Sequence, residues 1–321
     1  MSFSWRQRFT GWERSPQLGM TLLAITMLAA AAATYLAGGT QSAFPHLFYV
    51  PVLIGSFFFG PLGGVLAGLV AGIICGPVMP LDTALGLAQP ASGWVIRLVF
   101  FTGVGLCAGT LTRSLHRRID ELHQLNEEVV RAFVRALDAK DHYTSRHSEK
   151  VAEYAAGIAC QMNLPPETRE RVRWAALLHD VGKLAVPSQI LNKPGKLDPS
   201  EWELIQRHPV ESCRIFEGVA HFRPLLPAIR HHHERVDGRG YPDGLTAKDL
   251  PLEARIIAVA DAFDAMTSQR AYRDPMSEED AIRELEQGAG SQFDPQVVAA
   301  FVAWRRSLAA AQGQPVPRVA S

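Results

Sequence analysis

The sequence predicts an all-α protein in three parts: an N-terminal transmembrane helical domain of about four spans, a connecting helix with a short coiled-coil pattern, and a C-terminal all-helical soluble domain. No Asp, Glu, Lys or Arg occurs at the 67 consecutive positions from Ser15 to Leu81, although charged residues make up 20% of the 321-residue chain. A heptad pattern follows the last apolar stretch. Beyond it, apolar residues recur with helical spacing and little strand-like alternation. This composition excludes a uniformly globular protein.

The overall charge and the cysteines exclude other classes of protein. Lys and Arg total 32, and Asp and Glu total 32, so the formal net charge is zero. We therefore expect no strongly basic surface and no nucleic-acid polymer as a partner. The four cysteines are scattered and form no C-x-x-C pair, which fits a reducing compartment and excludes a disulfide framework.

The membrane domain is predicted at residues 18–112, after a cytoplasmic segment at residues 1–17. Its four apolar stretches are Leu18–Gly38, Phe44–Gly60, Pro61–Met79 and Ala91–Thr112. The two middle stretches are short and separated only by a turn at Gly60 and Pro61, which predicts a helical hairpin. A re-entrant pair is the alternative that short apolar segments permit. Arg97 lies inside the fourth stretch, where it would snorkel to the interface or face the interior of the bundle.

Flanking charges predict the orientation of this domain. The arginines nearest the first and last stretches are Arg6, Arg8, Arg14, Arg113, Arg117 and Arg118. Both clusters favour the cytoplasm, and an even number of spans places both there. We therefore predict a multi-pass protein of the inner (cytoplasmic) membrane, with the N-terminus and the soluble domain in the cytoplasm. The alternative for the first stretch is a cleaved signal peptide, which the three later stretches disfavour.

The connecting segment, residues 113–134, carries the heptad pattern. Apolar residues and one Asn follow each other by alternating steps of four and three: Leu115, Ile119, Leu122, Asn126, Val129 and Phe133. Such a seam predicts a parallel homodimer in which Asn126 would set the register. The alternative is one amphipathic helix that packs on the soluble domain. In both cases a continuous helix offers a mechanical route for a signal.

The soluble domain is predicted at residues 135–311. Its helical spacing is illustrated by one stripe made of Val151, Tyr154, Ala155 and Ile158. The last ten residues, 312–321, contain two prolines and are predicted to be disordered.

Histidine is the informative residue of the soluble domain, because eight of the 11 histidines fall between His142 and His233. Candidate ligands lie on separate predicted elements: His147, His179, Asp180, His208, His232, His233 and Asp261. Imidazole and carboxylate together suit Fe, Mn or Zn. Six or seven ligands exceed one tetrahedral site and suit two metals bridged by a shared carboxylate.

Two motifs carry a family resemblance. "LLHDVGKL" (177–184) resembles the signature of HD-domain metal-dependent phosphohydrolases, and "HHERVDGRGYP" (232–242) resembles the defining motif of the HD-GYP cyclic di-GMP phosphodiesterases. The motifs around them, in the family's order, are "YTSRHS" (143–148), "RHP" (207–209), "VADAFDAMTSQRAYR" (259–273) and "FDP" (293–295). The resemblance covers residues 128–302, over half of the chain.

The resemblance implies an all-helical fold and a role for each ligand. His147, His179, Asp180 and Asp261 would hold one divalent metal. His208, His232 and His233 would hold the second, with Asp180 bridging, and Fe or Mn are the expected metals. His179, Asp180 and Lys183 would form the catalytic group, in which a water shared by two cations becomes a nucleophile at neutral pH.

Substrate contacts follow from the same resemblance and from local chemistry. Lys183 is expected one helical turn beyond His179, on the same face, where its ammonium would bind a phosphate. Arg270 and Arg273 would bind the phosphates and guanine of the substrate, the alternative being a salt-bridged helix surface. The loop residues Asp237, Gly240 and Tyr241 would shape the pocket and contact partner proteins, with Tyr241 in a structural rather than a catalytic role.

One position departs from the family pattern. Some members place a Glu four residues before the first His, which adds a third metal, whereas this chain has Tyr143. The sequence therefore predicts a two-metal, membrane-anchored cyclic di-GMP phosphodiesterase that forms mainly pGpG, with further hydrolysis to GMP as a minor outcome. The alternatives are a phosphohydrolase for another cyclic dinucleotide and a receptor that binds the nucleotide without hydrolysing it.

Overall fold

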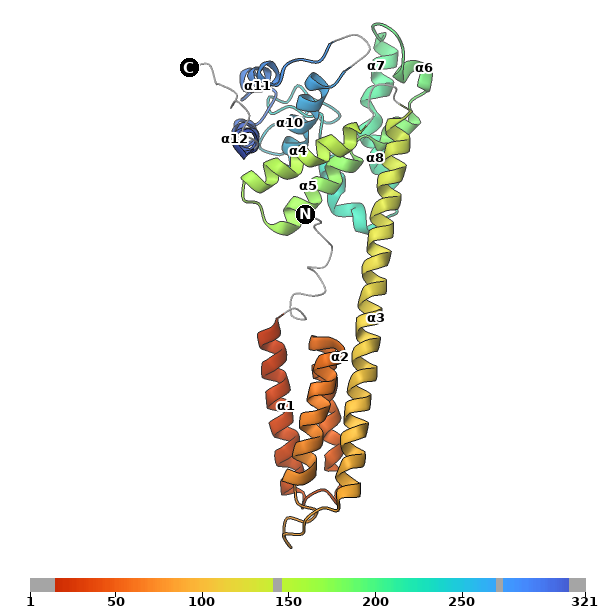
Figure 1. The fold of residues 1–321 in the computed structure, drawn as a ribbon. Coiled ribbons are helices and arrows are strands. Elements are labelled where there is room, and N and C mark those ends of the chain that lie inside the picture. The colour runs from red at the N-terminus through yellow and green to blue at the C-terminus, as the bar shows by residue number, and fades with distance from the viewer. Residues whose placement is uncertain (1–14, 141–145, 270–273, 312–321) are drawn as a thin grey trace. The chain divides into compact units, whose positions relative to one another are not determined.

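The computed structural model describes residues 15–140, 146–269 and 274–311. In these ranges the regular structure is helical, and the strand-like hydrogen bonding is limited to isolated bridges (Figure 1). The all-α prediction is therefore confirmed. The chain divides into two compact units, Met1–Glu127 and Glu128–Ser321, called here the N-terminal and C-terminal units.

The helices that begin in the N-terminal unit are α1 (Pro16–Leu36), η2 (Phe44–Phe48), α2 (Tyr49–Ile73), η3 (Ile74–Val78) and α3 (Ala91–Asp138). Three of the stretches they form are long and apolar enough to cross a membrane: Pro16–Leu36, Phe44–Val78 and Ala91–Asp138. The predicted fourth span and the connecting helix are thus a single helix, α3, which continues into the first residues of the C-terminal unit.

The second of these stretches folds back on itself. Gly60 has φ 67° and ψ −154°, a conformation that interrupts the helix, and Pro61 follows it. A Cβ atom built on Gly55 would lie 2.8 Å from the Cβ of Ala67, so the segments on either side of Gly60 lie side by side. The helix is therefore interrupted at the predicted position, Gly60. The stretch consists of two antiparallel helical segments, called here the first leg (residues 44–60) and the second leg (residues 61–78).

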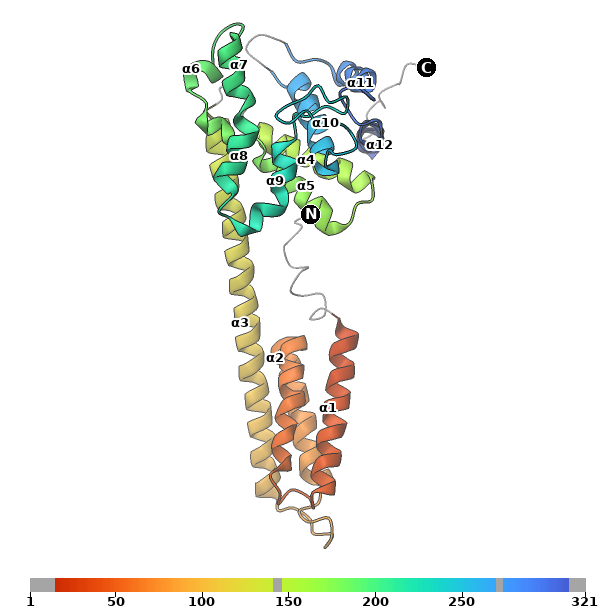
Figure 2. The ribbon, with the colours of Figure 1, turned by 180° about the vertical axis from the view of Figure 1, so that it is seen from behind.

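Small residues bring the second leg close to α3 (Figure 2). A Cβ on Gly68 would lie 2.6 Å from the carbonyl oxygen of Phe101, and Gly64 meets Gly105 in the same way one turn earlier. Backbone approaches of this kind are typical of helices that associate in membranes. The core of the unit consists of Met27, Ala30, Phe48, Val52, Ala67, Ala71, Cys75 and Phe101.

Arg97 faces a polar group at the loop end of the bundle. Its guanidinium donates to the side-chain oxygen of Gln89. The amide nitrogen of Gln89 in turn donates to the carbonyl oxygens of Gly76, at 3.0 Å, and Met79, at 2.6 Å. Arg97 therefore helps to hold the end of the second leg, where the backbone leaves the helix.

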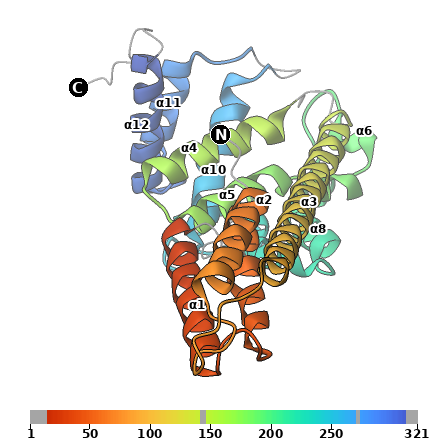
Figure 3. The same cartoon turned by 60° about the horizontal axis from the view of Figure 1, so that its bottom comes forward.

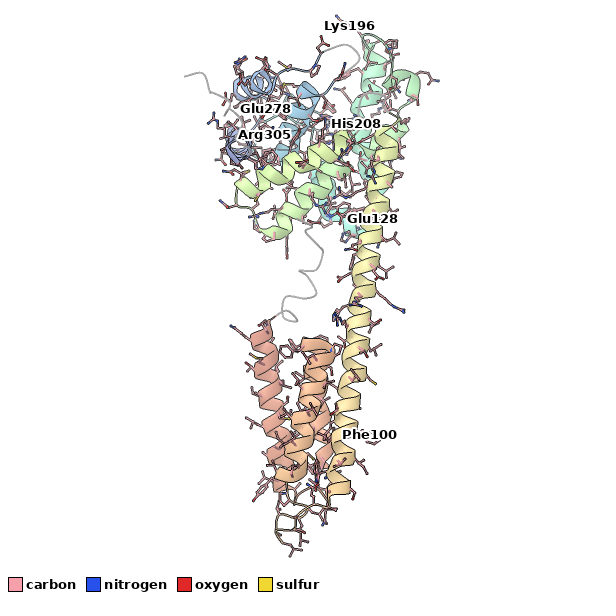
Figure 4. All side chains as sticks on the ribbon, viewed as in Figure 1. Phe100, Glu128, Lys196, His208, Glu278 and Arg305 are labelled. Atoms are coloured by element: carbon pink, nitrogen blue, oxygen red, sulfur yellow. The ribbon has the colours of Figure 1, made fainter. Side chains whose placement is uncertain are left out.

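The C-terminal unit contains α4 (His147–Gln161), α5 (Pro166–Leu178), η4 (Val181–Ala185), α6 (Ser188–Leu191), α7 (Pro199–Gln206), α8 (His208–Phe216), η5 (Ala220–Leu225), α9 (Leu226–Arg230), α10 (Leu252–Thr267), α11 (Glu278–Gln287) and α12 (Pro295–Ala311). Helix α4 packs against α5, α10 and α12, and α8 packs against η4 (Figure 3). Helix α12 is tied to α11 by two bonds of 2.7 Å from Arg305 to Glu278 (Figure 4). The predicted disordered tail, residues 312–321, lies outside the described residues.

Candidate metal centre

Helix ends of the C-terminal unit converge on a buried group of histidines and aspartates. His147 and His208 are the first residues of α4 and α8, and His179 with Asp180 directly follows α5. The side chains fall into two groups, each with ligand atoms within 4.8 Å of one another: His147, His179 and Asp180, and Asp180, His208, His232 and His233. The structure thus brings together six of the seven predicted ligands, with Asp180 common to both groups.

A close contact between η4 and α8 brings the two groups together. The Ser212 hydroxyl donates to the carbonyl oxygen of His179 at 2.8 Å and accepts from the Gly182 N–H at 2.7 Å. A Cβ on Gly182 would lie 2.5 Å from the Ser212 nitrogen. Gly182 is therefore required because the turn after Asp180 lies directly on α8, which begins at His208. The sequence reasoning missed Ser212, and its position in the chain offers no signal of this role.

Three histidines are oriented by backbone carbonyl groups. The Nδ1 atoms of His179, His208 and His232 lie 2.7, 2.6 and 2.7 Å from the carbonyl oxygens of Ala176, Ile205 and Ile229. With the proton assigned to Nδ1, each Nε2 presents a lone pair to the centre. The Nε2 atoms of His208 and His232 are only 3.3 Å apart, and two facing lone pairs repel unless a cation lies between them. The donor set therefore fits a divalent metal.

Asp180 reaches both groups with different oxygens. Its Oδ2 lies 3.4 Å from His179 Nε2 and 3.6 Å from His147 Nε2, whereas its Oδ1 lies 3.3 Å from His208 Nε2. Burial would raise the pKa of this carboxyl, but His179, Lys183 and His208 hold it well below its usual range. An ionised carboxylate in this position can bridge two cations.

His147 is held by two carboxylates, one of which the sequence reasoning missed. The predicted ligand Asp261, on α10, has its Oδ1 3.3 Å from His147 Nε2. On the other side of the ring, the buried Asp264 contacts Nδ1 with its Oδ2 at 2.7 Å. Burial lowers the pKa of His147, but Asp261, Asp264 and Asp180 more than offset this and raise it to about 10. A carboxylate behind a ligating imidazole fixes the orientation of the ring, and Asp264 lies three residues after Asp261, one helical turn away.

Three further imidazoles, those of His179, His232 and His233, have lowered pKa values and are kept neutral. Burial lowers the pKa of His179 and, together with the neighbouring imidazoles, that of His232 to well below its usual range. Burial also lowers the pKa of His233, to about 3. Neutral imidazoles and ionised carboxylates are the forms that bind metals. The lowered pKa values of these three imidazoles therefore suit metal binding, whereas His147 would have to lose its proton to bind a metal.

The position of Lys183 corrects one expectation. Helix α5 ends at Leu178, and Lys183 lies on the 3₁₀ turn η4, so it does not share a helical face with His179. The tighter turn brings its Nζ to 2.7 Å from Asp180 Oδ2, a contact with spacing i,i+3. The ammonium of Lys183 therefore lies against the shared carboxylate at the edge of the metal centre.

The loop after His233 is held by Glu234. This buried carboxylate accepts from the N–H groups of Asp243, Gly244 and Leu245 at 2.7, 2.9 and 3.1 Å. A Cβ on Gly240 would lie 2.7 Å from the carbonyl carbon of Glu234, so only glycine permits this folding back. The sequence reasoning missed Glu234. A buried acid with three backbone donors is recognisable only after the loop has closed.

Tyr241 and Asp237 have different surroundings in this loop. The Tyr241 ring lies 4.9 Å from the His233 ring, centroid to centroid, beside the candidate metal ligands. Asp237 instead binds Arg235, at 3.0 and 2.8 Å, and Arg239, at 3.2 Å. The carboxylate of Asp237 is thus used within the loop. Arg270, Arg273 and Tyr143 lie outside the described residues.

The fold and the site together define a class of protein. Residues 131–297 match the HD domain family, and the chain belongs to this family. The chain is 42% identical over 175 residues to the 3'3'-cGAMP-specific phosphodiesterase 3 of Vibrio cholerae, covering 54% of this chain and 38% of that protein. It is 37% identical over 207 residues to the cyclic di-GMP phosphodiesterase response regulator RpfG of Xanthomonas campestris, and this match covers 64% of this chain and 55% of that protein. It is 39% identical over 173 residues to a cyclic di-GMP phosphodiesterase of Thermotoga maritima, covering 53% and 46%. The matched region spans about half or less of the length of these relatives.

Proposed function

We propose that this protein is a membrane-anchored cyclic di-GMP phosphodiesterase that hydrolyses one phosphodiester bond to give pGpG. The observation that carries the proposal is Asp180, which has one oxygen directed at each of two groups of buried histidines. Relatives named cyclic di-GMP phosphodiesterases support the substrate.

Each ligand has a role in this proposal. His147, His179, Asp180 and Asp261 hold one divalent metal, and His208, His232, His233 and Asp180 hold the other, with Fe or Mn as the ions that this mixed donor set suits. When bound, the two ions supply a water of lowered pKa and neutralise charge on the phosphoryl oxygens. Lys183 contacts Asp180, and its positive charge at this edge of the centre attracts the substrate phosphate.

Other residues of the chain complete the substrate site in the proposal. Arg270 and Arg273 bind the phosphates and guanine, and the loop of Asp237, Gly240 and Tyr241 forms one wall. Tyr241 lies against His233 and so borders the metals, whereas Asp237 shapes the loop through Arg235. The exposed side chain of Arg239 makes the same loop a candidate surface for partner proteins.

The test combines metal and product analysis. Full-length protein purified without oxygen should contain two metal ions per chain and convert cyclic di-GMP to pGpG. The Asp180→Ala variant should lack the two metal ions and should not hydrolyse cyclic di-GMP. The same sample is offered 3'3'-cGAMP, because one relative is named for that substrate. If the protein hydrolyses 3'3'-cGAMP faster than cyclic di-GMP, 3'3'-cGAMP is its substrate. If a metal-replete sample binds the nucleotide tightly without hydrolysing it, the protein is a receptor.

The membrane location is proposed from the three apolar stretches and the flanking arginines. In this proposal the chain crosses the inner membrane an even number of times, with Gly60 as the turn between two crossings, and both ends of the N-terminal unit lie on the cytoplasmic side; the apolar helices and the break at Gly60 support it. A reporter fused after Ser321 should be active only in its cytoplasmic form. A periplasmic reporter signal at this position would contradict the topology.

We also propose that α3 forms a homodimer that conveys control from the N-terminal unit. The apolar seam residues of α3 are between 46% and 59% exposed: Leu115, Ile119, Leu122, Val129 and Phe133. Inserting seven residues after Leu122 keeps the heptad register, whereas inserting four rotates the seam. The seven-residue insertion should keep the dimer and its activity, and the four-residue insertion should change both. Equal behaviour of the two insertions would exclude a coiled coil at this seam.

A further inference from the structure

The last turn of α3 is bound to the start of α4. Asp138, the last residue of α3, is buried, and its Oδ1 accepts from the Ser148 hydroxyl at 2.8 Å. Its Oδ2 accepts from the Ser148 N–H at 3.3 Å. The residue before α4, Arg146, provides no side-chain cap, so the carboxylate of Asp138 caps one N–H group of the first turn, that of Ser148. Ser148 directly follows the metal ligand His147.

Lys140, two residues later, is bound to the other side of the metal centre. Its Nζ donates to the carbonyl oxygens of Lys183, Leu184 and Val186 at 3.3, 3.1 and 2.8 Å. An ammonium has three N–H donors, and these three acceptors account for all of them. The carbonyl of Lys140 accepts from the Asn192 side chain at 3.1 Å, which holds the backbone of Lys140 in place.

Two of the three carbonyl groups, those of Lys183 and Leu184, belong to η4, and the third, that of Val186, directly follows it. Backbone bonds close both ends of this turn: the Lys183 N–H donates to the carbonyl oxygen of Asp180 at 2.9 Å, and the Val186 N–H donates to that of Lys183 at 3.1 Å. Lys183 Nζ lies 2.7 Å from Asp180 Oδ2, the carboxylate shared by both ligand groups. Lys140 thus holds the backbone of the residue whose ammonium contacts the shared carboxylate.

We infer that Asp138 and Lys140 are positioning residues, through which the last turn of α3 sets His147 on one side of the metal centre and Lys183 on the other. This inference rests on the proposed phosphodiesterase function. It makes the end of α3 a part of the catalytic apparatus, although neither residue is a metal ligand. A cap that only stabilised the fold would affect unfolding and leave kcat unchanged.

The test compares Lys140→Met with Lys196→Met in the full-length protein. Lys196 is exposed in the loop before α7, so its loss controls for the removal of a charge (Figure 4). Lys140→Met should lower kcat for cyclic di-GMP about tenfold, the effect typical of residues that orient a metal centre. KM should rise as well, since Lys183 is one of the proposed phosphate ligands, and Lys140→Arg should restore part of kcat. Lys196→Met should behave as the wild type.

A second measurement does not depend on turnover. Amide hydrogen exchange at Lys183 and Val186 should become about tenfold faster in Lys140→Met and stay unchanged in Lys196→Met. A Lys140→Met protein with wild-type kcat and wild-type exchange overturns the inference. If the wild type itself does not hydrolyse cyclic di-GMP, the proposed function fails and the exchange rates alone decide whether Lys140 positions η4. If Lys140→Met does not fold, Lys140→Gln decides by the same two measurements, because its amide keeps two N–H donors.

Discussion

The N-terminal and C-terminal units are both helical, but different interactions hold their helices together. In the N-terminal unit the large apolar side chains of Leu28, Leu62 and Phe100 (the last labelled in Figure 4) are exposed, and the helices meet through glycines. In the C-terminal unit large apolar side chains such as Ile256, Phe263 and Phe301 are buried, together with a group of histidines and carboxylates that hydrogen bonds orient. The contrast is expected if lipid surrounds one unit and water the other, because lipid gives apolar side chains no reason to be buried.

Because of this difference, the two units should be sensitive to different kinds of substitution. Helices that meet backbone to backbone have no room for an added methyl group, whereas a polar centre depends on each hydrogen-bond partner. The following changes test this difference, from the largest expected effect to the smallest.

Removing the shared carboxylate should have the largest effect. Asp180→Ala leaves two groups of histidines without their common ligand, and we expect kcat to fall at least about a thousandfold, as for other central catalytic groups. Metal content should fall in the same sample, while the helix content and the thermal unfolding of the N-terminal unit stay as in the wild type. Retention of both metals by Asp180→Ala would contradict a bridging role.

Changing Glu234 should weaken the loop beside the metal centre. Glu234→Gln replaces an acceptor of three backbone N–H bonds with an amide whose NH₂ group faces donors, at a cost of about 2 kcal/mol. The loop that carries Tyr241 should then be cut faster by a protease, and kcat should fall about tenfold. Glu217→Gln, at an exposed position, is the control and should change neither measurement.

A single methyl group should test the glycine packing of the N-terminal unit. A Cβ on Gly105 would overlap the carbonyl of Gly64, whereas a Cβ on Gly103, two residues earlier on the same helix, would meet nothing within 4 Å. Gly105→Ala should therefore lower the free energy of unfolding in detergent by about 1–3 kcal/mol. Gly103→Ala should leave it unchanged or raise it slightly, since alanine favours a helix. Equal effects of the two substitutions would mean that these helices do not pack in this way.

Labelling of native thiols perturbs the protein least, and it tests whether lipid surrounds the N-terminal unit and water the C-terminal unit. Cys107 of α3 and Cys160 of α4 are both exposed. In intact membrane vesicles that expose the cytoplasmic face, a water-soluble maleimide should label Cys160 and spare Cys107, which lipid would cover. Labelling of both at equal rates would place Cys107 outside the bilayer.

Cys213 provides a pH-dependent control in the same experiment. Burial raises the pKa of its thiol to about 11, so at pH 8 about one molecule in a thousand carries the reactive thiolate. Its labelling should accelerate roughly tenfold for each pH unit between pH 8 and pH 10. A rate that does not change over this range would contradict the raised pKa.

The sequence allowed a large part of the fold and the site to be predicted, because those features follow from local order. Long uncharged stretches predict apolar helices whatever they pack against. The positions of His147, His179, His208 and His232 were predicted because histidine is rare and its clustering is visible along the chain. The turn at Gly60 and Pro61 was predicted because glycine permits backbone angles that other residues avoid and proline interrupts the hydrogen bonds of a helix, and both effects are local.

Only the tertiary structure decided which residues support those ligands. Asp264, Ser212 and Glu234 are common residue types, and nothing in their local sequence marks them as buried partners of His147, the Asp180 turn and the loop. Lys183 was placed on the wrong local structure because α5 ends at Leu178, where the chain turns tightly against α8. A hydrogen bond between residues far apart in the chain depends on how helices pack, and helical periodicity does not specify that packing. The residue types of the metal centre could thus be read along the chain, while their distances, orientations and charges were set by the contacts among α4, α5, α8 and α10.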